Sequence, residues 1–193
     1  MEIVKFTPAM LDDGGAVAQS IWGDDIPPAS DADKKNMFRY LIRFYFFTGS
    51  PFNFALKDDE GDICGAILGH VDAIHGDHAG IAYLAEHPEL LKITNFTPWT
   101  DLLNFNRAKE EAALGENEII LDLFMSKRKG GGRMLMNGFS EAAKSAGIKS
   151  MLLWTDDCCD FDYYNHNHFT QVGEFYSALG KDKHKTFLFR KFF

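Results

Sequence analysis

The stretch SKRKGGGRMLMNGF, residues 126–139, places four cationic side chains next to three consecutive glycines. The cations are Lys127, Arg128, Lys129 and Arg133, in a chain whose net charge is -8. A segment typical of a helix follows, and positive charge at a helix N-terminus opposes the helix dipole. Free backbone N–H groups at such a terminus, made accessible by glycine, bind anions, most often phosphate. We therefore expect an anion site; the alternative is a flexible basic loop that leads into a helix.

Two common nucleotide-binding motifs do not fit these glycines. The P-loop pattern needs a Lys followed by Ser or Thr, and no such pair follows at the required spacing. The Rossmann pattern GxGxxG needs a third glycine or alanine where Leu135 stands. The segment also lies late in the chain, which leaves too few residues for further βαβ units.

Acidic side chains on the neighbouring predicted strands are candidates for a general base. Glu118 and Asp122 are four residues apart in the predicted strand 118–124, so their side chains point to the same face. Asp156 ends the next predicted strand. The alternative for each is a solvated or hydrogen-bonded strand carboxylate, which is the commoner state of a single acidic residue.

A zinc site is a competing interpretation of Cys158, Cys159, His166 and His168. Adjacent cysteines tend to point apart, and structural zinc sites use cysteine pairs separated by about two to four residues. The spacing therefore predicts no metal site. No hydrolase signature with a Ser-His-Asp or Cys-His arrangement stands out either.

Length and composition limit the classes of protein that fit. The 193 residues predict one domain over 1–193 with a substantial core, and 46% hydrophobic with 25% charged residues is a globular composition. No apolar run is long enough to span a bilayer, the N-terminus lacks the pattern of a signal peptide, and three cysteines form no disulfide framework. We expect a cytoplasmic protein with no membrane partner. A pI near 5.3 argues against nucleic acid as the partner.

The predicted elements alternate between strands and helices, which indicates a mixed α/β fold. Capping and periodicity predict a strand over 2–6, helices over 8–22 and 31–47, a hairpin around 58–61, an insertion over 73–117, a strand over 118–124, a helix over 131–146, a strand over 149–155, a short helix over 159–167 and a final antiparallel pair of strands.

The insertion over 73–117 is the most individual part of the chain. It contains a helical piece around 80–92 and a helix from Pro98 to about Leu114, preceded by Thr97 as its cap. Its aromatic and histidine side chains are expected to pack or to form a loop turn, with contact to a substrate as the alternative: Phe96, Trp99, Phe105, His75 and His78.

The second half of the chain resembles the GCN5-related N-acetyltransferase (GNAT) superfamily. The family's phosphate loop, [QR]-x-x-G-x-[GA], follows a strand and opens a helix, and KRKGGG (127–132) fits it with Lys in the first position. A second register begins at Lys129 and puts Met134 at a small-residue position. Downstream, YYNHNHF (163–169) is similar to the family's F-Y-x-x-x-G-F, with His168 in place of the glycine.

This resemblance implies a fold and an activity. It implies a GNAT-like, mixed and mostly antiparallel central sheet flanked by helices, with the helical insertion between strands three and four acting as a lid on the acceptor site. The implied enzyme is an acyltransferase that moves the acetyl group of acetyl-CoA, its co-substrate, to an amine of a small molecule or peptide. The alternatives are a non-catalytic acyl-CoA sensor and a protein-interaction domain with a degenerate site; the oligomeric state is open, with a homodimer among the options.

The resemblance also implies roles for particular residues. Tyr164 falls on the tyrosine that donates a proton to the leaving thiolate, and Asp122 or Glu118 would act as the base. A main-chain N–H near Phe124 or Met125 would stabilise the thioester oxygen. The implied residues that bind acetyl-CoA are Phe124, Met125, Ser126, Lys127, Arg128, Lys129, Gly130, Gly131, Gly132, Arg133 and Asp160.

Overall fold

The computed structural model describes residues 1–24, 29–71, 78–159, 161–179 and 182–193. Within these ranges no helix combines the length and the apolar composition needed to cross a membrane. Asp160 and His75, both singled out in the sequence, lie outside the described residues.

A seven-stranded mixed sheet forms the centre of the described structure, with the strand order β1-β2-β3-β4-β5-β7-β6. Neighbouring strands are antiparallel except β4 and β5, which are parallel. This arrangement confirms the predicted mixed and mostly antiparallel sheet. The strands are β1 (Glu2–Lys5), β2 (Phe54–Lys57), β3 (Ile63–His70), β4 (Glu118–Ser126), β5 (Ser150–Asp156), β6 (Thr170–Leu179) and β7 (Asp182–Phe192).

The helices follow the predicted order, and several boundaries are corrected: the first α-helix begins at Leu11, after a 3₁₀ turn over Pro8–Met10, and the short helix predicted over 159–167 spans Asp162–His166. The second helix ends at Phe44 and not at 47, and the long insertion helix begins at Phe96, two residues before the predicted Pro98. Asn95, in the left-handed region with φ 67°, precedes that helix, so Thr97 is not its cap. The helices are α1 (Leu11–Trp22), α2 (Asp31–Phe44), α3 (Ala79–Glu86), α4 (Phe96–Ala113), α5 (Gly131–Ser145) and α6 (Asp162–His166), with 3₁₀ turns η1 (Pro8–Met10) and η2 (Pro88–Lys92).

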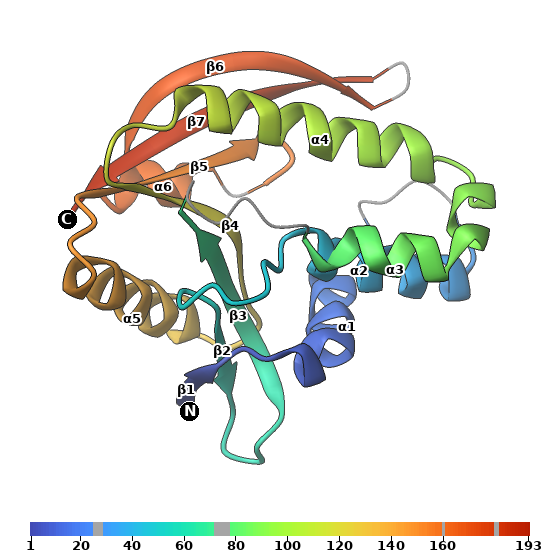
Figure 1. Ribbon diagram of the computed structural model, residues 1–193, viewed down its shortest axis with the longest axis horizontal. Coiled ribbons are helices and arrows are strands. Elements are labelled where there is room, and N and C mark those ends of the chain that lie inside the picture. Colours follow the sequence, from blue (N-terminus) through green and yellow to red (C-terminus); the bar gives the residue numbers. More distant parts are fainter. Residues whose placement is uncertain (25–28, 72–77, 160, 180–181) are drawn as a thin grey trace.

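Helices cover both faces of the sheet. Figure 1 shows α1 and α2 on one side of β3, α5 on the other, and α4 lying along β6 and β7. The insertion between β3 and β4 therefore consists of α3, η2 and α4, as the sequence predicted. Ser30 caps α2 in the expected way: its hydroxyl accepts a hydrogen bond from the Asp33 amide and donates one to the Asp33 carboxylate.

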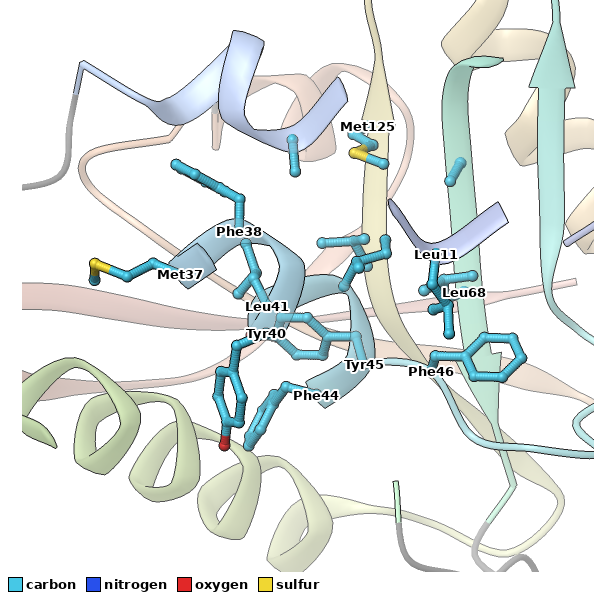
Figure 2. Packing of buried hydrophobic residues seen from close by; sticks show 14 of the residues in the cluster. Leu11, Met37, Phe38, Tyr40, Leu41, Phe44, Tyr45, Phe46, Leu68 and Met125 are labelled. Atoms are coloured by element: carbon cyan, nitrogen blue, oxygen red, sulfur yellow. The ribbon is translucent and has the colours of Figure 1, made fainter. Parts of the chain in front are cut away.

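Two hydrophobic cores hold these layers together. One lies on the α1, α2 and α4 side and includes aromatic residues of α2 beside Met125 of β4 (Figure 2). The other lies under α5, where Leu135, Met136 and Phe139 are buried, as expected for the helix that packs on the sheet. Ile119 and Leu121 of β4 point into the α5 core, whereas Leu123 and Met125 point into the other. In a regular strand these four residues, each two apart, would all share one face, so the strand is irregular between Leu121 and Leu123.

A bulge in β4 sits between these two sets of side chains. In the register with β3, Leu121 pairs with Gly69 and Leu123 pairs with Leu68, so Asp122 is skipped. A bulge bends its strand and re-aims the side chain of the extra residue. Asp122 therefore points toward α4, where it contacts Arg107.

Candidate functional site

The parallel strands β4 and β5 separate halfway along the sheet. They pair from Glu118 and Ser150 as far as Ile120 and Leu152, and no further in the described structure. Beyond that point β4 continues beside β3, and β5 continues beside β7 up to Asp156. The separation begins next to the bulge at Asp122, so a wedge-shaped gap opens in the backbone pairing of the sheet. We call this feature the strand opening.

The glycine-rich loop lies at the far end of β4, after the strand opening. Gly130 adopts a left-handed conformation with φ 82°, and α5 starts at Gly131. Among the described residues, no hydrogen bond engages the amides of Lys129, Gly130, Gly132 or Arg133. Four N–H groups without a partner among the described residues, at the start of a 15-residue helix, suit an anion such as a diphosphate.

Close packing explains why glycine is needed inside the loop. A Cβ on Gly131 would lie 2.5 Å from Leu56 Cδ2 and 2.5 Å from Ser126 Oγ. A Cβ on Gly132 would lie 3.1 Å from the ring of Phe124. The helix terminus is thus held against β2 and β4, which fixes the direction of its amides.

The four basic side chains of the loop differ in whether they form an ion pair with another residue. Arg128 Nη2 lies 2.9 Å from Asp58 Oδ2 in the β2–β3 turn, and this hydrogen bond holds the pKa of Asp58 below its ordinary value. The Lys127 amide donates to the Cys64 carbonyl at 2.9 Å, which continues the pairing of β3 with β4. Within the described structure, the side chains of Lys127, Lys129 and Arg133 form no ion pair. Of these three, Lys129 and Arg133 directly flank the glycines and have amides that are unbonded in the described part of the chain, so they are the better placed to meet an anion.

The remaining predicted loop residues have local roles. Ser126 Oγ bonds the Arg128 carbonyl at 3.2 Å and closes the turn. Met125 is buried in the α2 core, so only its backbone is available to a ligand. Phe124 is half-buried, and its ring lies 5.7 Å from the ring of Tyr163.

Tyr164 lies on α6 within an aromatic group on the α5 side of the sheet. Its ring stacks on Phe189 of β7 at 5.5 Å and meets Phe169 edge-on at 5.2 Å. The neighbouring Tyr163 turns toward Phe124 of β4, and burial raises its pKa. Tyr164 therefore packs against β7, and Tyr163 packs against β4.

His168 shows what replaces the family glycine after α6. Its backbone has φ 63°, the left-handed conformation that favours glycine. The turn keeps the backbone shape that the motif implies, although the residue is not glycine. Phe169, the next residue, is buried in the α5 core.

Glu118 is fully occupied by structural contacts at the paired end of β4. Its Oε1 accepts from Arg190 Nε at 2.6 Å and from Ser150 Oγ at 2.9 Å, and its Oε2 accepts from Arg190 Nη2 and from the Gly115 amide. This is the hydrogen-bonded carboxylate that the sequence held as the alternative to a base. The contacts favour a role in stability for Glu118.

Asp122 lies at the strand opening in a buried polar group. Its Oδ2 is 2.7 Å from His70 Nδ1, and its Oδ1 is 4.0 Å from Arg107 Nη2. The His70 ring stacks on Phe47 at 3.9 Å, which fixes its orientation. Arg107 donates to the Phe44 carbonyl and lies over the Phe44 ring. Both Asp122 and Glu118 face the α4 side, as their spacing predicted, but only Asp122 lies at the opening.

The structure adds two residues that the sequence did not single out. Asn106 and Glu110 of α4 are both buried, and the Asp122 carboxylate acts electrostatically on Glu110. Burial and the Asp122 carboxylate raise the pKa of Glu110 well above its ordinary value. The signal was present in the sequence as two polar residues one turn apart, in register with the apolar Trp99 and Leu103 on the buried face of the helix.

The cysteine and histidine residues do not assemble as the zinc hypothesis supposed. Cys158 Sγ lies 3.1 Å from His184 Nδ1, with Asp157 beside both, whereas His166 Nδ1 contacts the Asp162 carbonyl at 2.8 Å. The Cys159 residue is exposed, but desolvation by nearby protein atoms and the Asp156 carboxylate raise the pKa of its thiol. At neutral pH Cys159 is thus a protonated thiol.

The remaining insertion residues are mainly structural. Phe96 and Trp99 are buried in the α2 core, and Phe105 meets Phe175 of β6 edge-on. His78 precedes α3 and lies against Phe44, and burial lowers its pKa to about 4.

No family model matches the chain, and no curated protein matches it. Solved structures, in contrast, match it over nearly its full length. The C-terminal condensation domain of Ebony in complex with beta-alanyl-dopamine aligns with a TM-score of 0.66 at 10% identity, covering 100% of this chain and 98% of that chain. A GCN5-related N-acetyltransferase from Kribbella flavida aligns with a TM-score of 0.59 at 11% identity, covering 100% and 97%.

An aminoglycoside 6'-N-acetyltransferase complexed with coenzyme A also aligns, with a TM-score of 0.56 at 14% identity, covering 100% of this chain and 97% of that chain. At these identities the likeness is one of fold. The chain has the GNAT fold, which confirms the fold that the glycine loop and the tyrosine motif implied.

Proposed function

We propose that this chain is an acetyl-CoA-dependent N-acetyltransferase that acts on an amine of a small molecule or peptide in the cytoplasm. The observation that carries the proposal is the glycine loop at the end of β4. Its unengaged amides at the start of α5 suit a diphosphate, and the same strand separates from β5 a few residues earlier. A phosphate-bearing acyl carrier held at the loop can extend along β4 toward the opening.

Each group needed for acyl transfer has a candidate residue in this chain. Acetyl-CoA supplies an activated acetyl group and a thiolate leaving group. The backbone N–H groups of β4 beyond the bulge, near Phe124 and Met125, would stabilise the negative charge that develops on the thioester oxygen. Tyr164 would donate a proton to the thiolate, and the Asp122 carboxylate would favour a cationic amine at the opening.

Binding of coenzyme A tests the proposal directly. A ligand at about 100 times its Kd stabilises the folded state by about 2.7 kcal/mol, so coenzyme A is expected to raise the melting temperature clearly. Release of free thiol from acetyl-CoA in the presence of a panel of primary amines then tests catalysis. A protein that binds coenzyme A but releases no thiol would be the acyl-CoA sensor, and one that binds none would favour the interaction domain.

The role of Tyr164 has its own test. Tyr164→Phe keeps the ring contacts with Phe189 and Phe169 and removes the hydroxyl. Loss of a general acid lowers the rate by a factor of about 100 or more. Tyr163→Phe is the matched control, because that ring lies next to it on α6 and turns toward Phe124. Equal kcat values for Tyr164→Phe and the unmodified protein would remove Tyr164 from the mechanism.

A further inference from the structure

Helix α4 carries three buried polar side chains whose hydrogen bonds are incomplete in the described structure, and two of them, Asn106 and Glu110, have an unpartnered oxygen, whereas Arg107 lacks a partner at Nε. Asn106 is 0% exposed and Glu110 is 2% exposed. Neither Asn106 Nδ2, nor Asn106 Oδ1, nor Glu110 Oε1 has a hydrogen-bond partner among the described residues. Leaving a buried polar group unsatisfied costs about 1 to 3 kcal/mol, and most such groups in proteins are bonded. Two of them one helical turn apart indicate that a bound molecule completes them.

Glu110 lies where β4 and β5 separate. Burial is the largest cause of the raised pKa of Glu110, and the backbone N–H of Trp154 is close enough to its carboxylate to oppose that rise. Trp154 lies on β5, two residues beyond Leu152, the last β5 residue that pairs with β4. On the β4 side, Asp122 is the bulge residue at the same level and acts electrostatically on Glu110. Glu110 therefore faces the start of the strand opening from α4, near residues of both strands.

The charges around Glu110 leave it without a counter-ion. Asp122 is paired with His70 and with Arg107. Arg107 is further committed to the Phe44 carbonyl, at 2.7 Å. In the described part of the chain, no Lys, Arg or His nitrogen lies within ion-pair distance of Glu110. Two oxygens, Asn106 Oδ1 and Glu110 Oε1, lack a hydrogen-bond donor among the described residues. A donor that also carries positive charge would bond both oxygens and act as the counter-ion of Glu110.

We propose that Asn106 Oδ1 and Glu110 receive the ammonium group of a primary amine acceptor, and that Glu110 removes one proton from it. This proposal rests on the proposed acetyltransferase function and names its acceptor class. The step is balanced: R–NH₃⁺ and the Glu110 carboxylate become R–NH₂ and the neutral Glu110 carboxyl. The free nitrogen lone pair then faces the acyl group in the strand opening.

The surroundings of Glu110 suit a group that takes up a proton. Burial raises its pKa most, and Asp122 raises it further, while Arg107 opposes the shift. A base is most effective when its pKa lies near the working pH, and two acids whose environments differ divide the roles of fixed charge and proton acceptor. The titratable and charged groups that face this cluster are Asp122 of β4, His70 of β3, Arg107 and Glu111 of α4, and Tyr45 after α2.

The test compares Glu110→Gln with Glu111→Gln. Glu111 is the next residue of the same helix but is exposed, so it controls for a lost carboxylate on α4. With a primary amine that the unmodified protein acetylates, Glu110→Gln is expected to lower kcat by a factor of about 100 or more. It should also remove the rise in kcat with pH on the acid side, since that rise reports deprotonation of the base. The melting shift with coenzyme A should be unchanged in both variants.

A second readout does not depend on turnover. A carboxyl whose folded-state pKa is raised binds protons more tightly when folded, so its contribution to stability is lost as the pH rises from its unfolded value through its folded value. Glu110→Gln cannot ionise and should therefore gain stability relative to the unmodified protein as the pH rises, whereas Glu111→Gln should not. With coenzyme A present, n-butylamine should raise the melting temperature of the unmodified protein but not of Glu110→Gln.

The outcomes separate this inference from the proposed function. If coenzyme A binds and amines are acetylated, but Glu110→Gln retains full kcat with an unaltered pH profile, the inference is overturned and the acetyltransferase function stands. An n-butylamine shift that persists in Glu110→Gln overturns the ammonium site. If coenzyme A fails to bind at all, the proposed function falls first.

Discussion

Strand β4 holds two buried carboxylates, one at its paired end and one at the strand opening in its middle, and their surroundings differ in one respect. At the paired end, both oxygens of Glu118 are bonded, to Arg190, Ser150 and the Gly115 amide. At the opening, Asp122 has His70 and Arg107, but the adjacent Asn106 and Glu110 retain unpartnered atoms. Both carboxylates are buried to a similar extent. They differ in whether the polar atoms around them all have hydrogen-bond partners.

The difference follows from the strand pairing. Glu118 lies where β4 is bonded to β5, so the surrounding backbone is complete and side chains can close around the acid. Asp122 lies on a bulge where β4 loses β5 as a neighbour, so backbone and side-chain groups on both strands face a gap. A closed polar group adds stability, while a group with vacant bonds is available to a ligand. We expect mutations at the two carboxylates to affect different properties.

The largest expected effect on stability is at the paired end. Glu118→Gln removes the charge that Arg190 and Ser150 surround, and breaking a buried ion pair on one side costs about 3 to 5 kcal/mol. Chemical denaturation should show this loss, while kcat per folded molecule stays close to that of the unmodified protein. Glu116→Gln is the matched control, because Glu116 is exposed two residues earlier. If Glu118→Gln kept its stability and lost kcat, the roles of the two carboxylates would be reversed.

The same division explains what the sequence could and could not predict. Local signals predicted the order of elements well: Ser30 and Asp33 cap α2, and the glycines precede α5. They failed at Phe96, because Pro98 suggested a helix start and Asn95 in the left-handed region begins it earlier. The early end of α2, at Phe44, has no comparable signal in its apolar run, since Tyr45, Phe46 and Phe47 are buried outside the helix.

The candidate site was predictable only where one segment supplies it. The glycine loop is contiguous, and its helix start carries its own chemistry. The acidic cluster combines Glu110 of α4, Asp122 of β4 and the Trp154 amide of β5, which only the folded chain brings together. The spacing of Glu118 and Asp122 gave their common face but not their surroundings, because the bulge and the end of the β4–β5 pairing depend on tertiary structure.

A smaller effect is expected within the glycine loop, where a basic side chain that forms an ion pair lies next to basic side chains that form none in the described structure. Lys129→Gln combined with Arg133→Gln should weaken coenzyme A binding about tenfold, equal to about 1.4 kcal/mol, because no described ion pair occupies these side chains. Arg128→Gln should weaken it less, since Asp58 already holds that guanidinium. Calorimetric titration at low salt measures the difference, and higher salt should reduce it. A larger loss for Arg128→Gln than for the pair would assign the anion to Arg128.

The smallest expected effect concerns His168, which is exposed and holds φ 63° at the turn between α6 and β6. An L-residue in the left-handed region costs about 1 kcal/mol or more, and glycine adopts it without that strain. His168→Gly should therefore raise the free energy of unfolding by about 1 kcal/mol, whereas Asn165→Gly, inside α6, should lower it by roughly a few tenths of a kcal/mol. Denaturant titration of the two variants gives the sign of each change. If His168→Gly raised stability but also lowered kcat, the imidazole would contact a ligand. The strained backbone would then be retained for that contact.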